Sequence, residues 1–272
     1  MTQLTTHSAR EGSTTPAPPP FAPHRRRPLA AVLADPRVRL GAGTAVILVT
    51  AWAARRDRIS PAEVTAFRAV NGLPDRIHLP AWAIMQLGTF GAAPAAAGIA
   101  WLTGERRLAG QLLSAGTGTW ALSKLVKQMV HRPRPASLLP GTHRRGPDAA
   151  GLGYLSGHAG VAVALGAAAL PHLGPAGRAL TLIAIPAVGL TRIYVGAHLP
   201  LDSLGGAALG LAVDAVLTLV ATPGTQRARP DQARALSAEP PSTRRAIPSA
   251  GVHGRSRACR PNSVPAPHRR AR

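Results

Sequence analysis

The 272-residue sequence is poor in cysteine, lysine, aromatic side chains and acidic charge. Its single cysteine, Cys259, excludes an intramolecular disulfide and a zinc site built from several cysteines. The only lysines are Lys124 and Lys127, so nearly all of the net charge of +21 comes from arginine. Because this bias accompanies abundant Ala, Gly and Pro, it is typical of a GC-rich coding sequence. We therefore expect the charge to face a lipid surface and expect no nucleic-acid partner.

Acidic residues are scarcest in the central part of the chain. Between residues 79 and 221 they are Glu105, Asp148, Asp202 and Asp214. Long uncharged stretches separate them, and runs of about 18 or more apolar residues are typical of membrane spans. We predict an all-α fold, a six-transmembrane helix bundle, with spans near residues 38–54, 79–102, 108–130, 156–173, 178–195 and 200–221.

The two ends of the chain differ in composition from this centre. Residues 1–37 are rich in Pro, Ser and Thr, and residues 223–272 in Arg, Pro and Ser, so both are predicted to be disordered tails. Residues 38–222 form the predicted membrane-embedded domain. Within it, Ser60 followed by Pro61 predicts the start of a short interfacial helix, because Ser caps helices and Pro suits their first turn.

The distribution of arginine predicts the membrane orientation. Six spans would place both Arg-rich ends on one side, and positive charge makes that side the cytoplasm. The basic segment 55–58 then falls outside, which fits poorly. On this topology three polar clusters, at residues 127–135, 156–158 and 192–202, all meet at the outer face of the plasma membrane.

The first and third clusters supply cations. Lys127, Arg134 and Arg192 lie near one predicted membrane boundary, and guanidinium and ammonium groups both bind phosphate well. Pro133 and Pro135 flank Arg134 and stiffen its backbone. The alternative is that these long side chains merely extend to lipid headgroups.

The second cluster, Ser156-Gly157-His158, opens a predicted span. A helix N-terminus offers free backbone N–H groups and the positive end of the helix dipole, so it favours an anion. Glycine also lets a phosphate approach the backbone. An ordinary Ser cap beside a chance histidine is the alternative interpretation.

The third cluster also pairs a histidine with an acid, because His198 precedes Asp202 by four residues. A carboxylate at that spacing can accept a hydrogen bond from one ring nitrogen and leave the other as a nucleophile. The alternative is a helix-capping aspartate beside an interfacial histidine.

Taken together, K-x6-R-P, S-G-H and R-x5-H-x3-D, in this order and spacing, resemble the phosphatidic acid phosphatase type 2 superfamily. That family includes lipid phosphate phosphatases and is related to the vanadium haloperoxidases. The resemblance covers about residues 60–220. Two residues depart from the family's pattern: Leu155 stands before Ser156 where proline is usual, and Thr191 stands before Arg192 where serine is common.

The resemblance implies a role for each motif residue. His198 would attack phosphorus, Asp202 would orient it, and His158 would protonate the leaving group. The residues implied to bind phosphate oxygens are Lys127, Arg134, Ser156, Gly157 and Arg192. No metal and no cofactor is implied, because the cations would supply the charge stabilisation.

Other basic residues near the motifs are interpreted as outside the site. These are Lys124, His131, Arg132 and His172, while the loop residues His143, Arg144 and Arg145 are candidate headgroup contacts.

We therefore predict an integral membrane phosphatase that acts on a lipid mono- or diphosphate through a phosphohistidine. Polyprenyl diphosphates and phospholipid phosphates are both open as substrates, and so is the oligomeric state. Two alternatives use the same features differently. One is a vanadate-dependent peroxidase with vanadate bound in the same pocket. The other is a catalytically silent membrane scaffold that binds lipid, with the Arg-rich tail as its working part.

Overall fold

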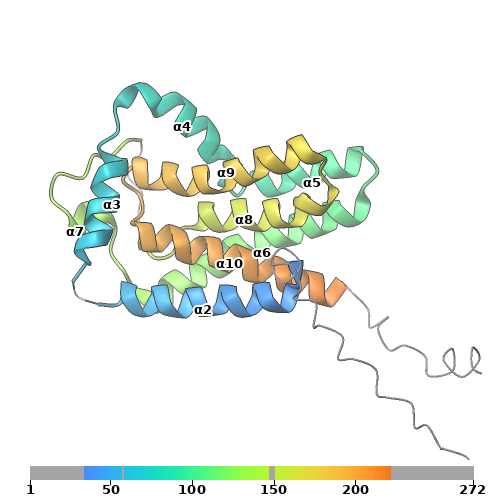
Figure 1. Cartoon of the computed structure of the whole chain (residues 1–272), viewed down its shortest axis with the longest axis horizontal. Coiled ribbons are helices and arrows are strands. Elements are labelled where there is room, and N and C mark those ends of the chain that lie inside the picture. Colours follow the sequence, from blue (N-terminus) through green and yellow to red (C-terminus); the bar gives the residue numbers. More distant parts are fainter. Residues whose placement is uncertain (1–33, 57, 147–150, 222–272) are drawn as a thin grey trace, which may run out of the picture. The chain divides into compact units, whose positions relative to one another are not determined.

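A computed structural model describes residues 34–56, 58–146 and 151–221. Every regular element within these ranges is a helix, so the prediction of an all-α fold is confirmed (Figure 1). Most of the two predicted tails, residues 1–33 and 223–272, lies outside the described residues.

The described chain contains α-helices joined by short 3-10 turns (η). In order they are α2 (Pro36–Ala54), α3 (Pro61–Asn71), η1 (Asp75–Ile77), α4 (His78–Met85), η2 (Gln86–Gly88), α5 (Ala92–Leu102), α6 (Arg106–Val130), α7 (Pro135–Leu138), α8 (Gly157–Ala169), η3 (Leu170–His172), α9 (Pro175–Tyr194) and α10 (Pro200–Ala221).

Side-chain caps followed by proline begin two of these helices. The Asp35 carboxylate accepts from the backbone N–H of Arg37 at the start of α2. The Ser60 hydroxyl accepts from the backbone N–H of Glu63, and Pro61 occupies the first turn of α3. The predicted start of the interfacial helix is confirmed.

Glycines allow α8 and α10 to pack closely. A Cβ added at Gly206 would lie 2.1 Å from the carbonyl oxygen of Ser156, and one added at Gly210 would lie 2.1 Å from that of Gly160. Gly206 and Gly210 are four residues apart and face the same neighbour, as small residues do where membrane helices meet. This contact sets the distance between the second and third motifs.

A buried cluster links the loop before α8 to α2 and α10. Tyr154 and Leu155 are fully buried in it, and the Tyr154 hydroxyl lies 2.9 Å from the hydroxyl of Thr50 on α2. Leu155 therefore fills a core position where the family usually has proline. Gly205 on α10 makes room for the Tyr154 ring, since an added Cβ would lie 2.7 Å from its oxygen.

Three described helices, α2, α9 and α10, are long and apolar enough to cross a membrane. The segments 75–88 and 92–102 are long and apolar enough only when taken together, and they are bent by 69° relative to each other. If this pair is one broken span, the number of possible membrane spans among the described residues rises to four. The prediction of six spans was therefore wrong, although helices lie at all the expected positions.

The two remaining expected spans fail for different physical reasons. Helix α8 has 13 residues, about 20 Å at 1.5 Å per residue, whereas the bilayer core is about 30 Å thick. Helix α6 is long enough, but its interior is not apolar enough, because Gln111, Lys124 and several Gly, Ser and Thr residues interrupt the apolar ones. The argument for the orientation of the termini rested on six spans, so membrane sidedness stays a prediction.

Candidate active site

The three polar clusters of the sequence meet at one end of α6, α8, α9 and α10. The backbone N–H of Ser156 donates to the carbonyl oxygen of Asp202 at 2.8 Å, which ties the second cluster to the third. The Arg134 guanidinium donates to the carbonyl oxygen of Ala197 at 2.9 Å, which ties the first cluster to the third. The convergence predicted from the sequence is thus present, even though the span count behind it was wrong.

His198 lies in the loop between α9 and α10 and is 3 % exposed. Its Nδ1 is 3.7 Å from Oδ2 of Asp202 and makes no hydrogen bond. Burial lowers the pKa of the His198 imidazole to about 4, against the opposing effect of the Asp202 carboxylate. The ring is therefore neutral at neutral pH and carries the lone pair that a nucleophile needs.

Two of the predicted phosphate-binding cations donate to backbone carbonyls of the protein. Lys127 Nζ donates to Leu152 at 3.0 Å and to Gly153 at 3.2 Å. Arg134 donates to Ala197 through Nη1, as above. These bonds hold both side chains beside the motif loops, and an anion would have to exchange with some of them.

Arg192, near the end of α9, has weaker protein partners. Its Nη1 lies 2.8 Å from the sulfur of Met85, and its buried Nε has no hydrogen-bond partner. A thioether sulfur is a weak acceptor. Arg192 therefore keeps donor capacity that a phosphate oxygen could use.

Ser156 is fully buried and caps α8, with its hydroxyl 3.4 Å from the backbone N–H of Ala159. Gly157 follows it, where an added Cβ would lie 3.0 Å from the hydroxyl of Ser123. His158 stands in the first turn of α8. Ser156 therefore does cap α8, and it also holds the N-terminus of this helix at the junction of the clusters.

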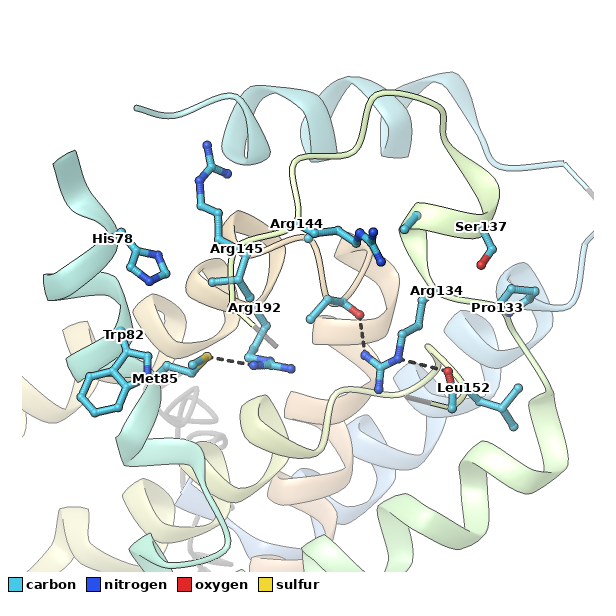
Figure 2. A pocket seen from close by; sticks show the side chains of 16 residues that line it. His78, Trp82, Met85, Pro133, Arg134, Ser137, Arg144, Arg145, Leu152 and Arg192 are labelled. Carbon is cyan, nitrogen blue, oxygen red and sulfur yellow. Dashed lines mark hydrogen bonds between the residues drawn. The ribbon is translucent and has the colours of Figure 1, made fainter. Parts of the chain in front are cut away.

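A cavity of 610 Å³ opens beside these residues, lined by α4, the loops after α6 and the end of α9 (Figure 2). Of the predicted site residues, Arg134 and Arg192 line it. His198 does not line it, although Val195, Gly196 and Ala197, which precede it in the same loop, do. The cavity therefore reaches the loop that carries His198.

The two loop arginines predicted as headgroup contacts, Arg144 and Arg145, line the same cavity. Arg145 is committed to the protein: it pairs with Asp75 at 2.7 Å and donates to three carbonyls around it. Its position accordingly supports the wall of the cavity.

Two residues in contact with the motifs were missed by sequence reasoning. Arg132, interpreted as outside the site, donates to Asp202 at 2.9 Å and pairs with Glu63 of α3 at 2.7 Å. Its exclusion was wrong, because it bonds directly to the acid beside His198. The scarcity of acids was the available signal: a buried arginine requires a carboxylate, and few are present.

Comparison with known proteins agrees with this arrangement. Residues 108–226 match the model of the PAP2 superfamily, a stretch that contains all three motif clusters. This part of the chain is therefore similar to the PAP2 superfamily, which agrees with the resemblance predicted from the motifs. Glu63 lies outside the matched stretch.

A relative of known function is decaprenylphosphoryl-5-phosphoribose phosphatase of Mycobacterium tuberculosis, found in strains CDC 1551 and H37Rv. The chain is 35 % identical to it over 120 residues, which make up 43 % of this chain and 64 % of the relative. The match therefore spans less than two thirds of that relative's length.

Two solved structures share the fold. A transmembrane PAP2-type phosphatidylglycerolphosphate phosphatase from Bacillus subtilis superposes with a TM-score of 0.55 at 18 % identity, covering 69 % of this chain and 99 % of that one. LpxE from Aquifex aeolicus gives a TM-score of 0.53 at 21 % identity, covering 58 % and 94 %. These similarities establish the shared fold.

Proposed function

We propose that the protein is an integral membrane phosphatase that hydrolyses a lipid mono- or diphosphate through a phosphohistidine on His198. The observation that carries this proposal is that two arginines, Arg134 and Arg192, line one cavity together with Ala197, the residue before the buried His198, which lies beside Asp202. The PAP2 match and the relatives described as phosphatases support the same chemistry.

The reaction begins with the exchange of protein contacts for phosphate oxygens. Arg192, whose contact with Met85 is weak, binds one oxygen of the transferring group, and Arg134 and Lys127 bind others. Their charge stabilises the transition state. In this proposal the residues do the work for which many phosphatases use a metal.

Covalent catalysis follows in two steps. Nε2 of His198 attacks phosphorus, the bond to the leaving oxygen breaks, and His158 gives its proton to that oxygen. Burial and the neighbouring cations otherwise lower the pKa of His158, and it becomes protonated when the anionic phosphate binds among those cations. Asp202 accepts from Nδ1–H and offsets the positive charge of the ring. Water then attacks phosphorus with His158 as base, the P–N bond breaks, and inorganic phosphate leaves.

The substrate class follows from the membrane setting and the relatives. A phosphate site at the end of apolar helices suits a phosphate attached to a long apolar chain. Sugar-linked polyprenyl phosphates, polyprenyl diphosphates such as undecaprenyl diphosphate, and phospholipid phosphates belong to this class. We place the site at the outer face of the plasma membrane with cytoplasmic termini, and residues 38–222 as the membrane-embedded catalytic unit.

The test is phosphate release by the purified protein in detergent, with excess chelator, from phosphatidate, phosphatidylglycerophosphate, polyprenyl diphosphates and sugar-linked polyprenyl phosphates. We expect turnover of at least one lipid and none by the His198→Ala variant. Activity that needs a divalent metal, or that survives His198→Ala, would contradict the mechanism.

The same preparation separates the alternatives. A lipid-binding scaffold would retain lipid without releasing phosphate from any of them. A peroxidase would oxidise halide when vanadate and peroxide are added. The three apolar helices disfavour the peroxidase, since relatives of that type are soluble.

A further inference from the structure

We infer that Glu63 and Arg132 are positioning residues that hold Asp202 and keep one net negative charge facing His198. The inference rests on the proposed function and extends it to two residues outside the three motifs. Glu63, Arg132 and Asp202 are called the buried charge chain below.

The buried charge chain joins three segments that are distant in sequence. Glu63 belongs to α3, Arg132 to the loop after α6, and Asp202 to the first turn of α10. Their exposed fractions are 6 %, 5 % and 0 %. Side chains of this kind are almost never so buried unless they are paired.

The geometry fixes the plane of each charged group. Arg132 binds Glu63 with both terminal nitrogens, at 3.0 and 2.7 Å, and uses Nη1 again to reach Asp202 at 2.9 Å. Glu63 also accepts from the backbone N–H of Leu201 at 3.1 Å, which ties it to the start of α10.

Both oxygens of Asp202 are oriented as a result. Oδ1 accepts from Arg132, and Oδ2 accepts from the backbone N–H of Leu199 at 2.7 Å. Oδ2 is also the atom that lies 3.7 Å from Nδ1 of His198. A shift of under one ångström would bring that contact into hydrogen-bond range of about 2.7–3.2 Å.

Charge counting assigns the role of Glu63. Arg132 alone would neutralise Asp202, whereas the two carboxylates and one guanidinium of the chain leave one net negative charge. That charge matters when His198 carries a phosphoryl group and its ring becomes positive. Because the groups are buried, water screens their interaction weakly.

A second ion pair on the same helix provides a matched control. Arg39 of α2 pairs with Asp214 of α10, which is 1 % exposed, and Gln111 of α6 donates to the same carboxylate at 3.2 Å. These groups do not contact the motif residues. Both pairs join an arginine to a buried aspartate of α10, although Arg39 is part-buried where Arg132 is buried.

The first experiment is the Glu63→Gln variant, assayed in detergent with the best substrate of the panel. It keeps the shape of Glu63 and removes its charge. We expect kcat to fall by about 10- to 100-fold, the usual effect of losing a partner that orients a reacting group. KM should change little, because no residue of the buried charge chain lines the cavity.

The second experiment is the Glu63→Gln/Arg132→Gln double variant. It removes one negative and one positive charge and so restores the net charge of the chain. We expect its kcat to exceed that of Glu63→Gln by at least about threefold, because neighbouring groups that couple are not additive. A purely structural role predicts the opposite, since the double variant lacks more bonds.

The control is the Arg39→Gln/Asp214→Asn variant. It should lower the unfolding temperature and leave kcat near the wild-type value.

Thermal unfolding of every variant shows which are folded. Should Glu63→Gln fail to fold, the double variant is compared with wild type instead, and a kcat within about tenfold supports the inference.

Three results would overturn the inference while the proposed function stands, and the first two are a wild-type kcat for folded Glu63→Gln and a folded double variant no faster than the single. A folded double variant without activity would also contradict it. If the wild type turns over no lipid phosphate, the proposed function fails and the inference fails with it.

Discussion

The two ends of α10 carry similar ion pairs with different surroundings. At its start Asp202 pairs with Arg132, and near its end Asp214 pairs with Arg39. Both acids are buried. The first pair continues to Glu63 on one side and to His198 on the other, whereas the second is completed by the neutral side chain of Gln111.

The two pairs differ in whether a neighbouring group changes its charge during the reaction. Asp202 faces the His198 ring, which becomes positive in the proposed reaction, so the charge of Asp202 affects the rate of phosphoryl transfer. Asp214 faces an arginine that stays charged at all accessible pH values. Its pairing can therefore hold α2 against α10, and it should act on stability alone.

The largest expected effect comes from Asp202→Asn. The substitution keeps the shape and removes the charge that faces His198, so kcat should fall on the order of a thousandfold, as when an acid that orients a catalytic histidine is neutralised. Steady-state phosphate release measures it. An effect on kcat as small as that of Asp214→Asn would remove the distinction between the two ends.

A substitution of Arg192 tests the cation with the weakest protein partners. Arg192→Met should lower kcat about 100-fold, the typical effect of removing one group that stabilises the transition-state charge. The matched control is Arg107→Met, an exposed arginine on α6, which should leave kcat unchanged. Equal effects of the two variants would indicate a general role of positive charge.

The acidity of His198 provides a prediction on pH. Because its pKa is lowered to about 4, the nucleophilic form should persist as the pH falls from 7 to 5 and be lost only as the pH passes through about 4. An unperturbed histidine would lose it near 6.5. NMR titration of labelled ring nitrogens, assigned with His198→Asn, measures the value directly. A pKa near 6.5 would contradict the burial seen here.

The smallest effect on turnover is expected at the far end of α10. Asp214→Asn leaves Arg39 without its buried partner, so the unfolding temperature should fall on the order of 10 °C. Its kcat should stay within about threefold of wild type, since distant sites are usually independent. Differential scanning in the same detergent gives the first quantity and phosphate release the second.

Local sequence patterns predicted the parts of the molecule that depend on neighbouring residues. The helix start at Ser60-Pro61 depends on residues within one turn, and it was found. The spacing of His198 and Asp202 within one cluster likewise indicated their proximity. The motif order indicated the similarity to the PAP2 superfamily even though it says nothing about the packing between clusters.

The features that sequence reasoning missed depend on contacts between distant segments. Glu63 and Arg132 are 69 residues apart, and no periodicity links them. Hydropathy predicted six spans because it counts apolar runs and does not see that α8 ends after 13 residues against the core of the bundle. The absence of His198 from the cavity lining also follows only from the folded loops.

The central claim is that His198 carries the phosphoryl group, and rapid quenching tests it most directly. Substrate labelled in the transferring phosphate is mixed with excess enzyme in chelator, stopped in alkali, and digested for mass spectrometry. We predict an acid-labile phosphate on the peptide containing His198, absent from His198→Ala. In the first turnover it should form as fast as the dephosphorylated lipid. Phosphate release in the first turnover with no label on that histidine would contradict the account.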